Sequence, residues 1–490
     1  MIPISHSHLL SSIFKIASEH PEAIAVVTEN NEEISYADLS HNILRAAAYL
    51  KNTGISAGDR IIISALKEVE FIYFYFAAHL IGAVNVVVDA KNNAANLPYI
   101  LEQTRPALGL GVEFDAIHSQ LFEDITLPSL KPDDGDLYTE GLSENDTADI
   151  MFTSGTTGNP KGVLLSHANL FGSASNINSF IGNSSDDVEL LGLPICHSFG
   201  LGRLRCNLIV GAKVVLHNGF ANLKSVFNTI QRYGVTGFGM VPAVWAYIKR
   251  FSGQRIAAFA PQLRYIEIGS AALPREDKEL LCQLFPYTRI CMHYGLTEAS
   301  RSAFSELHID REFPDSIGRP VCSNVDILIF DDNGSPLPDG QAGEICVKGN
   351  MVTKGYLNPQ DNAEAFHGMY FRTGDGGYRD SDGRLYLTAR LKEIINVGGK
   401  KVNPVELEET VKEICGAESM AVAMADPDGI LGEVPKLLIV RDSFSISREE
   451  LNIKLQEVLA PYKRPRFIEI VDALPLTANG KKRRSLTSAD

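Results

Sequence analysis

Short apolar runs alternate with segments of helical periodicity from residue 1 to about residue 145. GDRIIISAL and AVNVVV are two of these runs, with a helical pattern between them, and LPYILEQTRPALGLG follows. The alternation resumes further on, through LLGLPI, AKVVLH, GVTGFGMV and LRYIEIGS. No fixed-period repeat is present. Alternating strands and helices predict parallel sheets covered by helices, and therefore an α/β fold.

The stretch from Phe71 to Val88 contains no Asp, Glu, Lys or Arg. It is long enough that a membrane-spanning helix has to be considered. However, His79, Gly82 and Asn85 interrupt it, and its end is β-branched. These features favour a buried helix over about 69–81 followed by a buried strand, and we therefore predict no membrane span.

The pattern changes from about residue 324, where short apolar runs are separated by turn residues as in VDILIFDDNGSPLPDG. This pattern of short apolar runs and turns predicts a small β-rich subdomain. The last hundred residues again look separate. Two helix starts are predicted there, at Asn403-Pro404 with Glu406 and at Ser447 with Glu450. The apolar faces expected to follow are Leu407, Val411 and Ile414 in the first helix, and Leu451, Leu455 and Val458 in the second.

Composition narrows the possible functions. The 490 residues are 45% hydrophobic and 21% charged, which is ordinary for a globular protein of about three domain-sized units. A net charge of -15 argues against nucleic acid as a partner, since phosphates would be repelled. The seven cysteines form no C-x-x-C pair, and the N-terminus lacks a secretory pattern. A cytoplasmic location is expected.

The most informative motif is MFTSGTTGNPKG at residues 151–162. A loop of this kind can place backbone N–H groups and hydroxyls around phosphate oxygens, while Lys161 neutralises charge. The spacing is not that of a Walker A loop, so a P-loop kinase or GTPase is disfavoured. The sequence therefore predicts a polyphosphate site of another type.

With this motif the sequence resembles the ANL superfamily of adenylate-forming enzymes, and most closely its acyl-CoA synthetases. The further motifs occur in the expected order along nearly the whole chain: LPICHSFG, GSAALP, HYGLTE, FRTGDGGYRD, ARLKEIINVGGKKVNPVELE and PLTANGKKRR. The resemblance implies an N-terminal domain of two αβ layers plus a β-rich subdomain, at residues 1–390. A small, mobile α+β domain is implied at residues 391–490.

The resemblance also implies the site for ATP and Mg²⁺. Glu298 would ligate Mg²⁺, a hard cation suited to carboxylate and phosphate oxygens, and Thr297 would bind the α-phosphate. Asp375 would accept both ribose hydroxyls. The β and γ phosphates would be held by the loop residues Thr153, Ser154, Gly155, Thr156, Thr157 and Lys161. Adenine would lie between the Tyr294 ring and the backbone of Gly269, Ser270 and Ala271.

Residues near the C-terminal domain would complete the chemistry. By resemblance Arg390 contacts ribose or phosphate, Lys392 is at the hinge between the domains, and Lys481 bridges the substrate carboxylate and the α-phosphate. A surface ion pair is the alternative for Arg390 and Lys392, and a solvated tail is the alternative for Lys481. Gly398 and Gly399 resemble the place where the pantetheine arm of coenzyme A passes close to backbone, with an ordinary turn as the alternative.

The acid that is activated is less well defined. His197 resembles the pocket histidine of acyl-CoA synthetases, and a structural histidine is an equal alternative. No Asp or Glu lies between Leu193 and Leu204 to pair with an α-ammonium group, so a fatty or aryl acid is favoured over an amino acid. Arg203 and Arg205 could pair with a second substrate carboxylate, or could lie on a solvated helix face. Candidate liners of the acid pocket are Phe199, Met240, Trp245 and Gly269.

We therefore expect an ATP- and Mg²⁺-dependent acid–thiol ligase that forms an acyl-adenylate and transfers the acyl group to coenzyme A. Two alternatives remain open. The enzyme could load an acyl carrier protein, or the chain could be a non-catalytic nucleotide-binding homologue. The presence of chemically competent residues at Lys161, Glu298, Asp375 and Lys481 argues against the last of these.

Overall fold

The uncharged run identified in the sequence folds as a buried helix and a buried strand, at the predicted bounds. Helix α3 spans Val69–Ile81 and ends where Gly82 adopts a left-handed conformation with φ of 76°. Strand β4 follows at Val84–Val88, with every residue buried. In the part of the chain that the structure describes, no helix is both long and apolar enough to cross a membrane. The structure is a computed structural model that describes residues 6–90, 96–114, 117–130, 141–153, 160–416, 419–444, 446–476 and 482–484.

Strand β4 belongs to the first of two α/β sheets. The other strands of this sheet are β3 (Arg60–Ser64), β5 (Leu108–Leu110), β6 (Ser119–Gln120), β7 (Thr147–Thr153) and β8 (Lys161–Ser166). They lie in the order β6-β5-β3-β4-β7-β8, and all neighbours are parallel except β7 and β8. In the sequence, the predicted phosphate loop falls between these two antiparallel strands.

The second sheet has the order β14-β13-β12-β11-β9-β10-β1-β2, with a parallel centre and antiparallel edges at β14 and β2. Its strands are β1 (Ile24–Val27), β2 (Glu33–Ser35), β9 (Val188–Leu191), β10 (Lys213–Leu216), β11 (Gly237–Met240), β12 (Tyr265–Ile268), β13 (Arg289–Tyr294) and β14 (Ala303–Glu306). The prediction of parallel sheets covered by helices is confirmed.

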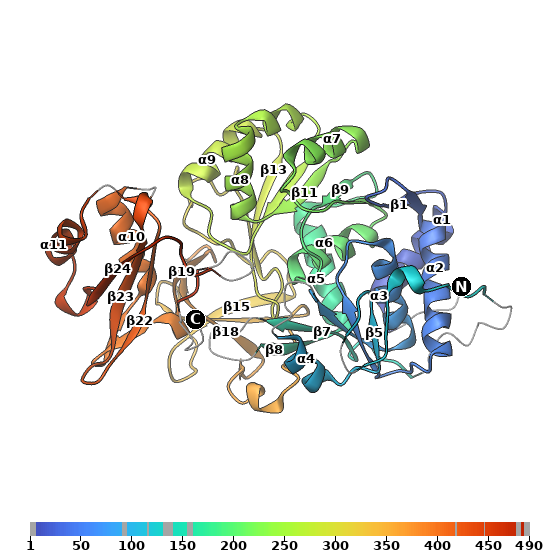
Figure 1. Cartoon of the computed structure of the whole chain (residues 1–490), viewed down its shortest axis with the longest axis horizontal. Coiled ribbons are helices and arrows are strands. Elements are labelled where there is room, and N and C mark those ends of the chain that lie inside the picture. The colour runs from blue at the N-terminus through green and yellow to red at the C-terminus, as the bar shows by residue number, and fades with distance from the viewer. Residues whose placement is uncertain are drawn as a thin grey trace.

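Helices cover both sheets and join them (Figure 1). Helix α5 (His167–Ile181) contacts β8 of the first sheet, α6 (Ser198–Leu208) contacts β9 and β10 of the second, and α5 and α6 contact each other. The remaining helices of this part, besides α3, are α1 (His8–Glu19), α2 (Tyr36–Asn52), α4 (Leu97–Thr104), α7 (Leu223–Tyr233), α8 (Pro242–Ser252) and α9 (Arg275–Leu284). A single apolar cluster runs through both layers.

The β-rich subdomain predicted from about residue 324 is present. It consists of β15 (Val325–Phe330), β16 (Gly343–Gly349), β17 (Phe366–His367), β18 (Tyr370–Arg379) and β19 (Leu385–Arg390), all joined in antiparallel pairs. A short 3₁₀ turn, Leu391–Glu393, follows β19 and leads to the next sheet. The subdomain lies between the two α/β layers and the C-terminal sheet in Figure 1.

The C-terminal part packs two helices on one mixed sheet. The sheet contains β20 (Ile395–Val397), β21 (Lys400–Val402), β22 (Ala421–Asp428), β23 (Gly432–Val440) and β24 (Phe467–Val471), and the helices are α10 (Pro404–Cys415) and α11 (Arg448–Val458). Both predicted helix starts are confirmed: the Asn403 side chain accepts from the Val405 N–H, and that of Ser447 accepts from Glu450. The large and small α/β parts fit the fold class expected by resemblance.

One part of the predicted helix faces is wrong. Leu451 and Leu455 are fully buried, but Val458 is 62% exposed. Helix α11 ends at Val458, and the chain then turns so that Leu459 fills the core position instead. The helical spacing that places residues 451, 455 and 458 on one face therefore stops being valid at the last residue.

A cluster of buried histidines lies where α1, α3 and α5 meet. His167 is 2% exposed, and its ring centroid is 5.2 Å from those of His6 and His79. His79 is in turn paired with the buried carboxylate of Asp149 at 2.8 Å. Burial, together with His79 and His6, lowers the pKa of His167 to about 2. His167 is therefore neutral in the folded protein at any physiological pH.

This cluster predicts acid-sensitive folding. Below its ordinary pKa of 6.5, His167 binds a proton in the unfolded chain but not in the folded one. The free energy of unfolding should therefore fall with decreasing pH, by about 1.4 kcal/mol per pH unit for this residue. Urea denaturation at pH 7, 6 and 5 measures the slope. His167→Asn should reduce it, whereas the exposed His41→Asn should not; equal slopes in both variants would refute the assignment.

Candidate active site

The first functional position is the end of the β7–β8 pair. Thr153 ends β7 and is the register partner of Lys161, the first residue of β8. The Lys161 ammonium is paired with Asp361 at 2.6 Å and lies 5.0 Å from the centre of the Tyr356 ring. Ser154, Gly155, Thr156 and Thr157, which the resemblance places in the phosphate loop, lie outside the described residues.

Glu298 and Thr297 follow strand β13 at its carboxyl end, and both side chains are partly exposed. The Tyr356 hydroxyl donates to Oε1 of Glu298 at 2.9 Å. Burial raises the pKa of Glu298, although the bond from Tyr356 opposes that effect. A partly exposed carboxylate with one oxygen held by Tyr356 fits a Mg²⁺ ligand.

Tyr294, Asp375 and Arg390 come from three different strands and meet. Tyr294 ends β13, and its hydroxyl donates to Oδ2 of Asp375 at 2.7 Å. The other oxygen of Asp375 is paired with Arg390, which also donates to the backbone oxygen of Thr373. Asp375 is buried, 7% exposed. The predicted ribose residue and the predicted adenine residue are therefore direct neighbours.

The residues predicted to lie against adenine follow β12, the strand beside β13. Gly269 is buried, and a Cβ there would lie 2.1 Å from a ring carbon of His293, so only glycine fits. Ser270 has a φ of 75°, an unfavourable left-handed conformation for a residue with a Cβ. Ser270 and Ala271 are exposed. Adjacent parallel strands thus bring Gly269–Ala271 and Tyr294–Glu298 to one edge, where ligands bind in α/β sheets.

The remaining predicted residues divide into two groups. His197 is the residue before α6, at its N-terminal cap position, and is partly buried. Lys392 lies in the 3₁₀ turn after β19, although the structure does not describe its side chain, and Lys481 lies outside the described residues. The segment next to Lys481 is anchored, because Lys482 and Arg484 both pair with the buried carboxylate of Glu408 on α10. Lys482 and Arg484 are therefore not part of a solvated tail, whereas Arg483 between them is exposed.

Gly398 and Gly399 form the two-residue turn of the β20–β21 hairpin. Their φ values are 55° and 86°, the left-handed values that such a turn requires. The Asn396 side chain accepts from the Gly399 N–H at 2.9 Å and fixes the turn. The turn by itself accounts for glycine at both positions, and a contact with coenzyme A stays a prediction.

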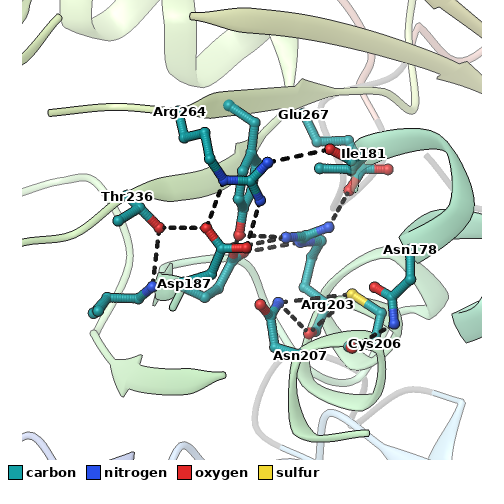
Figure 2. A network of polar contacts seen from close by, with 12 residues as sticks. Asn178, Ile181, Asp187, Arg203, Cys206, Asn207, Thr236, Arg264 and Glu267 are labelled. Carbon is teal, nitrogen blue, oxygen red and sulfur yellow. Dashed lines mark hydrogen bonds and ion pairs between the residues drawn. The ribbon is translucent and has the colours of Figure 1, made fainter. Parts of the chain in front are cut away.

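Both expectations for Arg203 and Arg205 are wrong: they neither lie on a solvated helix face nor are free to pair with a substrate carboxylate. Arg203 is fully buried and is paired with Glu189 at 2.7 Å and with Glu267 at 3.3 Å. Figure 2 shows Arg203 inside this network of polar contacts. Arg205 is 1% exposed and pairs with Asp149 at 3.3 Å. Both guanidinium groups are already neutralised, so neither is available to a substrate carboxylate.

Two of the proposed pocket liners also belong to the core. Met240 and Trp245 have no exposed surface and lie in the apolar cluster of the second sheet. Phe199, which is 6% exposed, instead contacts the His293 ring at a centroid distance of 4.6 Å. The first turn of α6 and the end of β13 therefore share one wall, next to Gly269.

Comparison with known proteins agrees with this arrangement. The AMP-binding enzyme family matches residues 13–357, and the C-terminal domain of AMP-binding enzymes matches residues 406–481. The chain belongs to the AMP-binding enzyme family. The expected membership of the ANL superfamily is thereby confirmed, and with it the class of AMP-forming ligases that join an acid to a thiol through an acyl-adenylate.

Named relatives of this AMP-binding enzyme align over almost the whole chain. A 2-succinylbenzoate–CoA ligase of Bacillus velezensis is 33% identical, covering 95% of this chain and 94% of the relative. A 4-coumarate–CoA ligase of Nicotiana tabacum is 29% identical, covering 97% and 93%. The o-succinylbenzoate CoA synthetase of Bacillus subtilis with its acyl-adenylate intermediate superposes with a TM-score of 0.83 at 27% identity, covering 96% of each chain. The same synthetase with ATP and magnesium ion also gives 0.83.

The sequence interpretation missed His293 and the buried charges behind it. Nδ1 of His293 lies 2.8 Å from Glu267, which is also paired with Arg301. Arg301 donates to the backbone oxygens of Ser198 and Phe199 at the start of α6. Burial would raise the pKa of Glu267, but Arg301 and His293 outweigh it and hold the pKa well below its usual range. A signal was present in the sequence, because Glu267 interrupts the otherwise apolar run YIEI.

The buried network predicts a large cost for removing its central charge. Glu267→Gln leaves Arg301 without its carboxylate partner in the interior, and we expect the free energy of unfolding to fall by roughly 3 kcal/mol or more. Glu279→Gln is the matched control, since Glu279 forms an exposed pair with Arg275 and should change stability by less than about 0.5 kcal/mol. Denaturant unfolding of both variants gives the comparison. Equally small losses of unfolding free energy in the two variants would show that the buried network does not stabilise the protein in this way.

Proposed function

We propose that this enzyme activates an aryl carboxylic acid with ATP and transfers the acyl group to coenzyme A. A carboxylate oxygen of the acid attacks the α-phosphorus, the bond from that phosphorus to the β-phosphate bridge breaks, and pyrophosphate leaves. The coenzyme A thiol, losing its proton to solvent, then attacks the acyl carbon, and AMP departs. The observation that carries the proposal is the convergence of Lys161, Glu298, Tyr294, Asp375 and Arg390 from three sheets.

The roles of the site residues follow from their chemistry. Lys161 and the loop from Thr153 to Thr157 bind the β and γ phosphates, and Thr297 binds the α-phosphate. Glu298 holds Mg²⁺, which supplies positive charge against the phosphate oxygens when bound. Asp375 accepts the ribose hydroxyls, and Arg390 and Tyr294 orient its carboxylate. The adenine ring lies along Gly269, Ser270 and Ala271 beside Tyr294.

The C-terminal residues serve the two half-reactions in turn. Lys481 joins the substrate carboxylate to the α-phosphate, where two anions must approach. Glu408 is the residue that positions the segment of Lys481, through its pairs with Lys482 and Arg484. Lys392 is the hinge between residues 1–390 and residues 391–490. The Gly398–Gly399 turn lies along the pantetheine arm in the second half-reaction, with His197 near the acyl group in the first domain.

The residues near the proposed site of the acid favour one class of acid. Between Leu193 and Leu204 there is no carboxylate for an α-ammonium group, and Arg203 and Arg205 are engaged in the interior. An aromatic ring, Phe199, and the His293 ring lie at the wall beside Gly269. The two curated relatives reported above are ligases named for coumarate and succinylbenzoate, both of which carry an aromatic ring. These features support an aryl acid without an amino group.

A cytoplasmic location is part of the proposal. All seven cysteines are free thiols, and those of Cys206, Cys291 and Cys346 are buried. Such cysteines are typical of proteins in a reducing compartment.

Substrate class and acceptor can be tested together. Pyrophosphate release is measured over a panel of aryl, fatty and amino acids, with coenzyme A or with a phosphopantetheinyl carrier protein. We expect the fastest release with an aryl acid, and a thioester product with coenzyme A. A thioester formed only on the carrier protein would replace coenzyme A as acceptor. No pyrophosphate with any acid would favour the non-catalytic alternative.

The role of Lys481 has its own test. Lys481→Ala removes the ammonium that offsets repulsion between the two reacting anions, and we expect the rate of adenylate formation to fall about 100-fold. Thioester formation from pre-made acyl-adenylate and coenzyme A should keep most of its rate. Lys15→Ala, at an exposed position on α1, controls for loss of a positive charge. Unchanged adenylate formation in Lys481→Ala would remove the residue from the mechanism.

A further inference from the structure

The segment from Thr353 to Asn362 contacts both halves of the proposed phosphate site. The N–H of Leu357 donates to the backbone oxygen of Gly162 at 2.7 Å, next to Lys161. The N–H of Thr353 donates to the backbone oxygen of Glu298 at 2.8 Å. This segment, which carries none of the residues proposed from the sequence, thus joins the start of β8 to the residues that follow β13.

Tyr356 lies at the centre of the segment and contacts two functional side chains. Its hydroxyl donates to Glu298 at 2.9 Å, and its ring lies under the Lys161 ammonium, 5.0 Å away. The backbone of Tyr356 is fixed on both sides by the Asn362 amide, at 2.8 and 3.1 Å. One rigid side chain therefore sets the separation between a cation and a carboxylate.

Asp361 is the negatively charged partner of Lys161. The two groups are 2.6 Å apart, and their side chains are only 25% and 34% exposed, respectively. Both remain accessible to solvent, so an incoming anion can reach the ammonium. A polyphosphate carries more negative charge than one carboxylate and offers more acceptor oxygens, so it is the stronger partner for Lys161.

We propose that Asp361 is a resident counter-ion of Lys161 that the β and γ phosphates of ATP displace, while Tyr356 keeps Lys161 and Glu298 in place. Asp361 thereby weakens ATP binding, because its carboxylate competes for the ammonium and repels the phosphates. The inference rests on the proposed function, in which Lys161 binds those phosphates. AMP lacks the β and γ phosphates, so Asp361 does not oppose its binding.

The counter-ion role of Asp361 is tested by asking whether removal of its charge strengthens ATP binding. Asp361→Asn keeps the shape of the side chain and removes its charge. By isothermal titration calorimetry in EDTA, we expect it to bind ATP about two- to fivefold more tightly than the parent, with AMP affinity unchanged. Asp332→Asn, at an exposed position, controls for net charge and should change neither affinity. Unchanged or weaker ATP binding by Asp361→Asn would overturn the proposal.

A double-mutant cycle separates this inference from the proposed function. In a Lys161→Met background, Asp361→Asn should no longer tighten ATP binding. If it tightens binding equally there, the effect is general repulsion and Asp361 is not the counter-ion of Lys161. If Lys161→Met alone leaves ATP binding unchanged, the phosphate role of Lys161 in the proposed function fails instead.

Tyr356 is tested by separating its hydroxyl from its ring. Tyr356→Phe keeps the ring beside Lys161, so ATP binding in EDTA should match the parent. The gain in ATP affinity on adding Mg²⁺ should fall about threefold or more, because Glu298 loses its fixed orientation. Tyr356→Leu should weaken ATP binding under both conditions. A full Mg²⁺ gain in Tyr356→Phe would show that Tyr356 does not position Glu298.

Discussion

The site depends on neutralising negative charge before a highly charged substrate arrives. ATP and a carboxylate are both anions, and the protein itself carries a net charge of -15. Three acidic side chains at the site already have a partner from elsewhere in the chain: Glu298 with Tyr356, Asp375 with Tyr294 and Arg390, and Asp361 with Lys161. These pairs hold the carboxylates in defined positions, and a cation offsets the charge of Asp375 and of Asp361.

The pairs can form only because three sheets meet at one place. The carboxyl ends of β12 and β13 bring together the segments that we propose bind adenine and Mg²⁺, the β7–β8 pair brings Lys161, and β18 and β19 bring Asp375 and Arg390. Behind this meeting point, Glu267 binds Arg203, Arg301 and His293 in the interior. Because buried charges tolerate little misplacement, the network gives the wall formed by His293 and Phe199 one position.

In the C-terminal part, ion pairs with a buried carboxylate likewise fix the segment of Lys482 and Arg484. Glu408 is buried on α10, yet it accepts from the Ala423 N–H and pairs with Lys482 and Arg484. A basic sequence near the chain end is thereby held against a helix. The described residues that follow Lys481 are therefore fixed on α10.

Local patterns in the sequence were sufficient for much of the fold. The bounds of α3, the caps of α10 and α11, and the alternation of strands and helices follow from the residue spacing within each segment. Ordered motifs also identified the family. Val458 shows the limit, because a helical face is defined only as far as the helix continues, and its end depends on what the next residue packs against.

Pairing between distant residues was decided by the tertiary structure alone. From the sequence, Arg203 and Arg205 could be available cations. In the structure they are paired with Glu189, Glu267 and Asp149. Tyr356 and Asp361 carry no motif, and only their contacts with Glu298 and Lys161 connect them to the site. Periodicity and capping act over a few residues, so the sequence determines them directly. A charge is neutralised by whatever the fold brings near it, and that partner is set by the packing of whole sheets.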